Sequence, residues 1–229
     1  MSAKIPRSVA LDGPAASGKT TIGKLLAARL GCLFFDTGVM YRAVALSAIR
    51  RGVDPADEAR VSRLAEEAAI DVLAPDADDG RACTVLLDGE DVTWAIRVPE
   101  VDAAVSQVSA HRGVRMAMVA QQRRIGLRGR VVMVGRDIGT VVLPEADLKI
   151  YLDASLAARA RRRHEEQKQR GGNQTLAEVQ AALAGRDEID SSRDLSPLRP
   201  ADDAVIMDTT ALTPEDILGR LEALSGGWS

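Results

Sequence analysis

The feature that most constrains the fold of this chain is an eight-residue loop near its N-terminus. The loop reads Gly13-Pro14-Ala15-Ala16-Ser17-Gly18-Lys19-Thr20 and fits the pattern G-x-x-x-x-G-K-[ST]. In this pattern the glycines let backbone N–H groups converge on phosphate oxygens, the lysine reaches the terminal phosphates, and the final hydroxyl can ligate Mg²⁺. An apolar run at residues 8–11 precedes the loop and a helical pattern at residues 19–30 follows it, as the pattern requires. We therefore predict a nucleoside triphosphate site with Mg²⁺ on Thr20, and we extend its contacts to Thr21.

Length and composition limit the class of protein. A chain of 229 residues can form one domain, with room for an insertion. Its net charge of −3 gives no field that would attract a nucleic acid or an anionic membrane. No apolar run is long enough for a signal peptide or a membrane span, and two cysteines, Cys32 and Cys83, suit a reducing compartment. We expect a cytoplasmic protein without nucleic-acid or membrane partners.

Strand-like and helix-like segments alternate along most of the chain. The expected strands are residues 8–11, 32–35, 131–134, 148–152 and 204–207, and the expected helices are residues 19–30, 39–51, 54–70, 100–110, 114–127, 155–169, 176–190 and 214–224. This alternation predicts an α/β fold with a doubly wound parallel sheet. Residues 71–73, 82–87 and 92–94, separated by Asp/Gly turns, predict a small antiparallel sheet. We expect it to be an insertion at about residues 69–105 of a single domain spanning residues 1–229.

Three classes of protein carry such a phosphate loop: GTPase switches, ATP-driven machines and small-molecule kinases. Guanine recognition in GTPases uses an Asn-Lys-x-Asp turn, but the only asparagine in the chain is Asn173, which Gln174 follows. None of the expected strands ends in the Asp-Glu pair that is usual in a machine. A kinase needs a second anion site, because two phosphates must be held in line while negative charge accumulates between them. The sequence favours a kinase if such a site is present.

Arginines occupy the places where a second anion site is expected. They follow predicted strands or lie on the late helices: Arg42, Arg136, Arg159, Arg162, Arg163, Arg186 and Arg193. The spacing of Arg159, Arg162 and Arg163 predicts one helical face, which suits a lid over the triphosphate at about residues 155–172. We assign these three, with Lys19 and Arg136, to catalysis. A solvated helix with Glu165 and Glu166 as ion-pair partners is the alternative.

Five segments resemble the bacterial cytidylate kinases closely. They are residues 11–20, 36–42 (Asp-Thr-Gly-Val-Met-Tyr-Arg), 104–109 (Ala-Val-Ser-Gln-Val-Ser), 135–142 (Gly-Arg-Asp-Ile-Gly-Thr-Val-Val) and 186–193. The predicted insertion also looks like the enlarged nucleoside-monophosphate-binding region of that family. The resemblance implies a P-loop kinase fold, Mg²⁺ and ATP as phosphoryl donor, CMP or dCMP as acceptor, and a monomer. Members often carry Gly or Ser where Thr20 stands, so the threonine supports the role in Mg²⁺ binding.

The resemblance also implies which residues hold the acceptor. Its phosphate would lie among Thr37, Arg42, Arg136, Arg186 and Arg193, its base would meet Ser106, Arg115 and Asp137, and its sugar would contact Asp190. Asp137 can accept from the cytosine amino group while Arg115 and Ser106 donate to N3 and O2. Uracil reverses two of these positions and would leave buried polar groups unpaired.

Simpler roles stay open for each base-reading residue. Ser106 could cap a helix, Arg115 could pair with a nearby acid, and Asp137 could bind Arg193 or Arg136. Two other functions also stay open. One is a kinase for another acceptor, such as UMP or a small hydroxy acid, and the other is a nucleotide-binding regulatory module without turnover.

Overall fold

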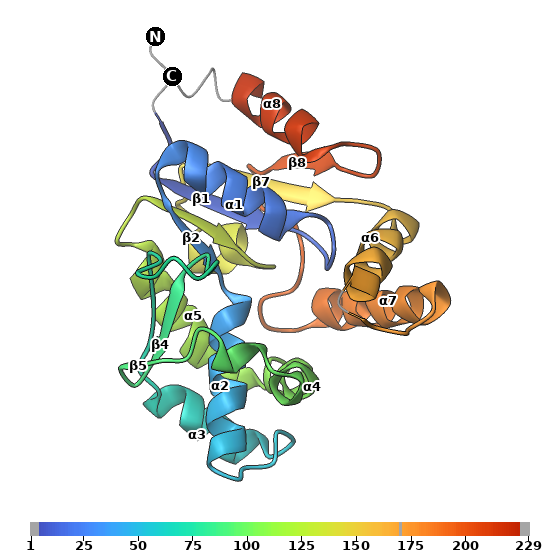
Figure 1. Cartoon of the computed structure of the whole chain (residues 1–229). Coiled ribbons are helices and arrows are strands. Elements are labelled where there is room, and N and C mark those ends of the chain that lie inside the picture. Colours follow the sequence, from blue (N-terminus) through green and yellow to red (C-terminus); the bar gives the residue numbers. More distant parts are fainter. Residues whose placement is uncertain (1–4, 170, 225–229) are drawn as a thin grey trace.

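A five-stranded parallel sheet forms the centre of the fold, in the order β2-β6-β1-β7-β8. The computed structural model (Figure 1) describes residues 5–169 and 171–224. The strands are β1 (Ser8–Asp12), β2 (Leu33–Asp36), β6 (Val131–Val134), β7 (Leu148–Asp153) and β8 (Val205–Asp208). Because β1 lies in the middle, the phosphate loop that follows it leaves the sheet at its centre. The prediction of an α/β fold with a parallel sheet is confirmed.

Alternating residues of the central strands face two separate cores. Val9 and Leu11 of β1 pack with α1 (Lys19–Leu30) and α8 (Pro214–Leu224), whereas Ala10 between them packs on the opposite side. That opposite side is covered by helices α2 (Gly38–Arg50), α3 (Glu58–Glu67) and α5 (Arg112–Gly126). Figure 1 shows the two groups of helices on either side of the strands. Both faces are therefore buried, as expected for a parallel sheet.

A second, antiparallel sheet follows α3. It consists of β3 (Ile70–Leu73), β4 (Thr84–Leu87) and β5 (Glu90–Asp91), with β4 in the middle. The prediction of a strand at residues 92–94 is wrong: the Asp91 carboxylate accepts a hydrogen bond from the Thr93 backbone N–H at 2.9 Å. This contact turns the chain toward a short 3₁₀ helix, η1 (Ala95–Arg97), so the strand ends at Asp91.

Two further segments differ from the sequence expectation. The helix predicted at residues 54–70 spans only Glu58–Glu67, because the Asp57 side chain caps its start by accepting from Arg60 N–H at 3.0 Å. Its expected last residues, Ala68 and Ala69, lead instead into β3. A π-helix, η2 (Ile138–Val142), follows β6 where no helix was expected.

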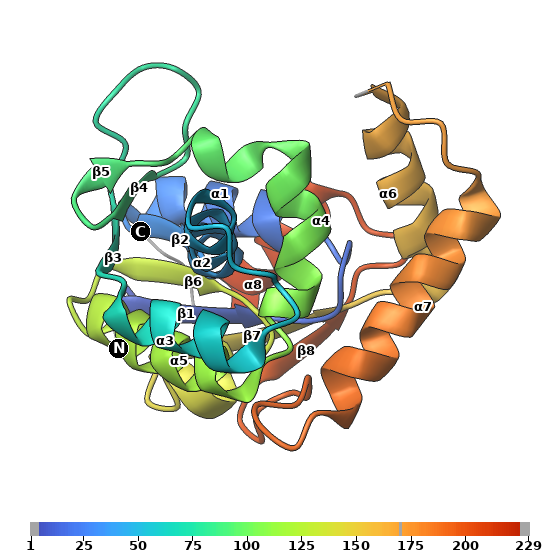
Figure 2. The same ribbon diagram turned by 90° about the horizontal axis from the view of Figure 1, so that it is seen from below.

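The remaining helices lie beyond the carboxyl ends of the strands. They are α4 (Pro99–Val108), α6 (Leu156–Gln169) and α7 (Leu176–Ser192), of which α6 and α7 pack against each other. Figure 2 shows this pair to one side of the sheet, with α4 facing it. Thr175 and Glu178 form a reciprocal capping box at the start of α7. Within residues 5–169 and 171–224, no helix combines the length and apolar character that crossing a membrane requires.

Candidate active site

A cavity of about 910 Å³ opens at the carboxyl ends of the central strands. Its walls come from the phosphate loop, the start of α2, the turn after β6, and residues of α6 and α7. The predicted residues that line it are Ala15, Ala16, Ser17, Gly18, Lys19, Thr20, Thr21, Thr37, Arg42, Arg115, Arg136, Asp137, Arg162, Arg163, Arg186, Asp190 and Arg193. Residues predicted to hold the two ends of a phosphoryl transfer thus share one space.

The phosphate loop depends on backbone conformations that favour glycine. Gly13 has φ of +143°, and a Cβ there would lie 2.0 Å from the carbonyl oxygen of Leu152. Lys19, 6% exposed, donates from Nζ to the Pro14 carbonyl at 2.5 Å and to Ser17 Oγ at 3.3 Å. Burial, reinforced by the charge of Arg136, holds the pKa of Lys19 well below its ordinary value. The loop therefore presents a poorly solvated cation that an anionic ligand would stabilise.

Asp36, at the end of β2, is a site residue that the sequence analysis missed. Its Oδ2 accepts a hydrogen bond from Thr20 Oγ1 at 3.2 Å and its Oδ1 accepts from Gly38 N–H at 3.0 Å. Asp36 and Thr20 both line the cavity. A hydroxyl and a carboxylate beside a phosphate loop are oxygen donors of the kind Mg²⁺ takes together with phosphates. The position of Asp36 at a strand end, directly before Thr37, was the available signal.

Three arginines surround one buried carboxylate on the far wall. Asp190, 2% exposed, pairs with Arg136 Nε at 2.9 Å, with Arg193, and with Arg186 Nε at 3.9 Å. Burial would raise the pKa of Asp190, but the charges of Arg136 and Arg193 outweigh it and the pKa is lowered. The three guanidinium groups exceed the one carboxylate in charge, so the cluster can take up an anion.

Thr37 and Arg42 extend this anion site toward α4. The Thr37 hydroxyl donates to the Val134 carbonyl at 2.9 Å, which fixes the side chain at the cavity wall. Arg42 Nη1 pairs with Asp102 on α4 at 2.5 Å and donates to the Ile96 carbonyl at 3.1 Å. Both predicted phosphate contacts therefore line the cavity and are held there by protein groups.

Arg115 and Asp137 form a buried ion pair. Their Nη2 and Oδ2 atoms lie 3.0 Å apart, with side chains only 5% and 6% exposed. The acid that pairs with Arg115 is thus Asp137, which is itself predicted to contact the base. Arg115 Nε is buried without a hydrogen-bond partner, and the guanidinium lies 5.6 Å from the ring centroid of Tyr41, which also lines the cavity. A carboxylate acceptor lies next to a guanidinium donor, and this pattern complements a cytosine edge.

Ser106 lies apart from this pair. It is exposed on α4 and lines an adjoining hollow of about 400 Å³ rather than the main cavity. Ser109, one helical turn along, lines both spaces, and its hydroxyl donates to the Ser106 carbonyl at 3.1 Å. Ser109 is thus a further residue of the cavity wall that was not predicted from the sequence.

The three arginines of the predicted lid do not share one environment. Arg162 lines the cavity and donates to the Thr209 carbonyl at 2.5 Å, while the exposed Arg163 pairs with Glu166 at 3.3 Å. Arg159 is buried, donates to the Ala15 carbonyl of the phosphate loop at 3.2 Å and pairs with Asp187 of α7 at 2.6 Å. Arg159 therefore ties α6 and α7 to the phosphate loop.

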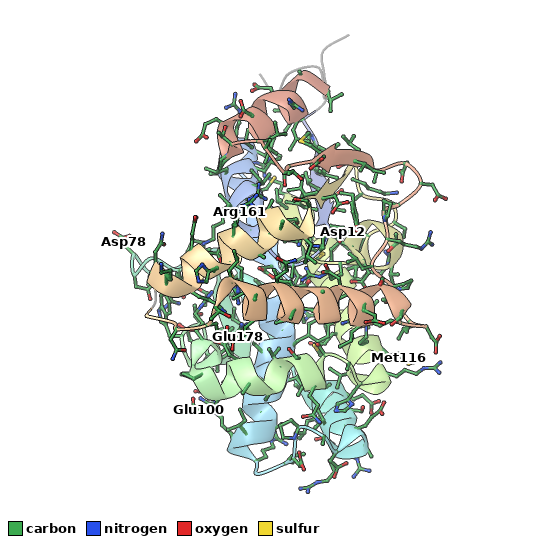
Figure 3. The ribbon with its side chains drawn as sticks, turned by 90° about the vertical axis from the view of Figure 1, so that its right-hand side faces the viewer. Asp12, Asp78, Glu100, Met116, Arg161 and Glu178 are labelled. Atoms are coloured by element: carbon green, nitrogen blue, oxygen red, sulfur yellow. The ribbon has the colours of Figure 1, made fainter. Side chains whose placement is uncertain are left out.

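Replacing Arg159 should destabilise the protein far more than replacing its neighbour. Arg159→Met leaves the Ala15 carbonyl and Asp187 without their partner, so we expect the free energy of unfolding to fall by about 2 to 4 kcal/mol. Arg161, exposed on the same helix (Figure 3), is the matched control, and Arg161→Met should change it by less than about 0.5 kcal/mol. Urea denaturation measures the free energy of unfolding of both variants. Equal losses in the two variants would contradict the conclusion that Arg159 holds α6 and α7 to the phosphate loop.

A family model and the curated relatives point to one family. The family model described as cytidylate kinase matches residues 9–224. The chain is 56% identical to the cytidylate kinase of Chloroflexus aggregans over 93% of this chain and 91% of that protein. It is 50% identical to the cytidylate kinase of Roseiflexus castenholzii, over 95% and 93% of the two chains. A crystal structure of TT1252 from Thermus thermophilus aligns over 96% of this chain and 98% of its own, at 20% identity and a TM-score of 0.43.

Proposed function

Because the chain belongs to the cytidylate kinase family, we propose that it transfers the γ-phosphoryl group of Mg·ATP to CMP or dCMP. The products are ADP and CDP or dCDP. One observation carries the proposal: a single cavity joins the phosphate loop to a buried Asp137–Arg115 pair across a cluster of arginines. The transfer is direct and needs no covalent enzyme intermediate, since phosphoryl transfer depends on positioning and electrostatics more than on a protein nucleophile.

The donor occupies the phosphate loop. Residues 13–21 hold the triphosphate, and Lys19 neutralises charge on its terminal phosphates. Arg162 and Arg163 line the cavity on the side of α6, which supports a lid at about residues 155–172 that shields the transferring group from water. Arg159 does not line the cavity and supports the phosphate loop by donating a hydrogen bond to the Ala15 carbonyl.

The acceptor phosphate lies on the opposite side. Arg136, Arg186 and Arg193 give this wall an excess of positive charge over Asp190, and Thr37 and Arg42 continue it. Two anions are thereby held facing each other at low entropic cost, the arrangement that in-line transfer requires. Asp190, at the centre of the arginines, is placed to contact the sugar as well.

The base lies against Asp137 and Arg115. Asp137 accepts from the cytosine amino group and Arg115 donates to N3 and O2, so both members of the buried pair gain partners. Ser106 joins them if α4 moves toward α7 when the acceptor binds. Uracil would place its O4 against a carboxylate and its N3–H against a guanidinium, which disfavours UMP.

Mg²⁺ fits beside Thr20. The Thr20 hydroxyl and the Asp36 carboxylate are adjacent oxygen groups at the cavity wall, and we propose that they hold the ion directly or through its water shell. Bound Mg²⁺ would supply charge neutralisation at the β- and γ-phosphates. The proposal also includes a cytoplasmic location and a monomeric state.

Acceptor-dependent release of ADP tests the assignment. Turnover with CMP and dCMP well above that with UMP and AMP is the expected result. Equal rates with CMP and UMP would favour a kinase of broader acceptor range, and ATP binding without turnover of any monophosphate would favour a regulatory module. Either outcome would overturn the proposal.

A further inference from the structure

Asp12, the last residue of β1, is a buried carboxylate that the proposed reaction leaves without a role. It is 5% exposed and immediately precedes Gly13, where the phosphate loop begins. Its Oδ1 accepts a hydrogen bond from Ile138 N–H at 2.9 Å, and its Oδ2 accepts from Gly139 N–H at 2.7 Å. Both donors come from the start of η2, directly after Arg136 and Asp137. Figure 3 labels Asp12.

The last two residues of β1 hold both ends of that turn. Leu11 accepts from Gly135 N–H through its carbonyl at 3.1 Å, on the near side of Arg136 and Asp137. Asp12 then binds Ile138 and Gly139 on the far side. Arg136 and Asp137 therefore lie between two anchors, which are the last two residues before the phosphate loop. These contacts link the turn that carries Arg136 and Asp137 directly to the strand that leads into the phosphate loop.

We propose that Asp12 is a positioning residue for the acceptor: its ionised carboxylate holds Arg136 and Asp137 in register with the phosphate loop, so that binding of the cytidine monophosphate depends on it. The inference rests on the proposed function. An uncharged side chain could not replace it fully, because two N–H groups point at two separate oxygens. An asparagine offers one oxygen and turns its NH₂ group against the other N–H.

Several charged or titratable groups surround Asp12. Lys19 faces it from α1, Asp137 from the turn, and Tyr151 from the paired position on β7. The stem of Lys149, whose ammonium pairs with Asp203, packs near Gly139 beside the carboxylate. Burial raises the pKa of Asp12 to about 6, against the lowering effect of the Gly139 and Ile138 hydrogen bonds. Its ordinary value is 3.8, so the folded state binds this proton more tightly than the unfolded state does.

The sign of the pH effect follows from that difference. Ionisation of Asp12 costs stability as the pH rises from about 4 to about 6, yet only the ionised form can accept both hydrogen bonds. The protein should thus gain acceptor binding at the expense of stability over this range.

Asp12→Asn, with Asp147→Asn as matched control, tests the proposal. Asp147 also accepts two backbone N–H groups, those of Arg7 and Ser8 at 2.8 and 3.0 Å, but at the opposite end of β1. For Asp12→Asn we expect the KM for CMP, and the calorimetric Kd of CMP alone, to rise about tenfold or more, with the KM for ATP within about twofold. Asp147→Asn should leave all three unchanged.

The pH profile separates positioning from scaffolding. The CMP phosphate itself titrates near pH 6, but this contribution cancels in the ratio of wild-type to Asp12→Asn kcat/KM values. We expect that ratio to fall as the pH drops through about 6, while the wild-type to Asp147→Asn ratio stays flat. The proposal would be overturned if the wild-type to Asp12→Asn ratio did not change with pH, or if the substitution raised the KM for CMP and the KM for ATP equally. Turnover of CMP by the wild-type enzyme would show that the proposed function still holds in that case. If Asp12→Asn does not fold, Asp12→Glu replaces it as the test, because glutamate keeps the charge but displaces it. Asp12→Glu must then raise the KM for CMP and leave the KM for ATP unchanged.

Discussion

Lys19→Met is expected to lower kcat/KM for CMP phosphorylation by about 10² to 10³-fold. Removal of one preorganised charge from a site where negative charge develops has effects of this size. The Lys19 ammonium is bound by loop oxygens, at 2.5 Å from the Pro14 carbonyl, and is 6% exposed. It is therefore in place before the nucleotide arrives, and its loss should appear in kcat as well as in the KM for ATP.

The same substitution should stabilise the ligand-free protein. Burial disfavours the charged form of Lys19, so replacement by an apolar side chain of similar length should raise Tm while abolishing most of the increase in Tm that ATP produces. Lys24→Met, on the exposed face of the same helix, is the control and should alter neither quantity. A Lys19→Met enzyme with near-normal kcat/KM would contradict the assignment of the phosphate loop.

Asp137→Asn is expected to reduce the preference for CMP over UMP by about 10- to 100-fold. An amide can turn its NH₂ group toward uracil O4, whereas the carboxylate can only accept. A single well-placed pair of hydrogen bonds discriminates between bases by this amount. The loss should fall on CMP, with UMP turnover unchanged or improved, and steady-state kinetics with both acceptors measures the ratio.

Glu145→Gln is the control for Asp137→Asn. Glu145 also pairs with an arginine, Arg123, at 2.7 Å, but both side chains are exposed and lie outside the cavity lining. Replacement of Glu145 should leave the preference for CMP over UMP unchanged. A uniform loss with CMP and UMP in the Asp137 variant would assign that residue to scaffolding, since Arg115 would then be left as an uncompensated buried charge in both complexes.

The sequence was sufficient where a local motif determines the backbone. Helix α1 spans Lys19–Leu30 as predicted, because the phosphate loop sets its start and Gly31, with φ of 59°, ends it. The parallel sheet was predicted from short apolar runs, most of which helical patterns separate along the chain. In both cases, residues close together in the sequence are sufficient to predict the secondary structure.

The sequence was insufficient where partners come from distant segments. The spacing of Arg159, Arg162 and Arg163 places them on neighbouring helical positions. It does not reveal that the phosphate loop lies against the first turn of α6, where its Ala15 carbonyl accepts a hydrogen bond from Arg159. In the same way, Asp12 gains its role from Ile138 and Gly139, more than a hundred positions away. The strand predicted at residues 92–94 failed for a shorter-range reason, since the Asp91 side chain turns the backbone there.

In the proposed function, one cavity holds the donor and acceptor nucleotides end to end. Calorimetric binding of a compound in which a polyphosphate chain joins adenosine to cytidine tests this arrangement. We predict a Kd at least about 100-fold below that of ADP or CMP alone, because the second half binds at high effective concentration, and weaker binding of the uridine counterpart. A joined compound that binds no more tightly than ADP would contradict the claim.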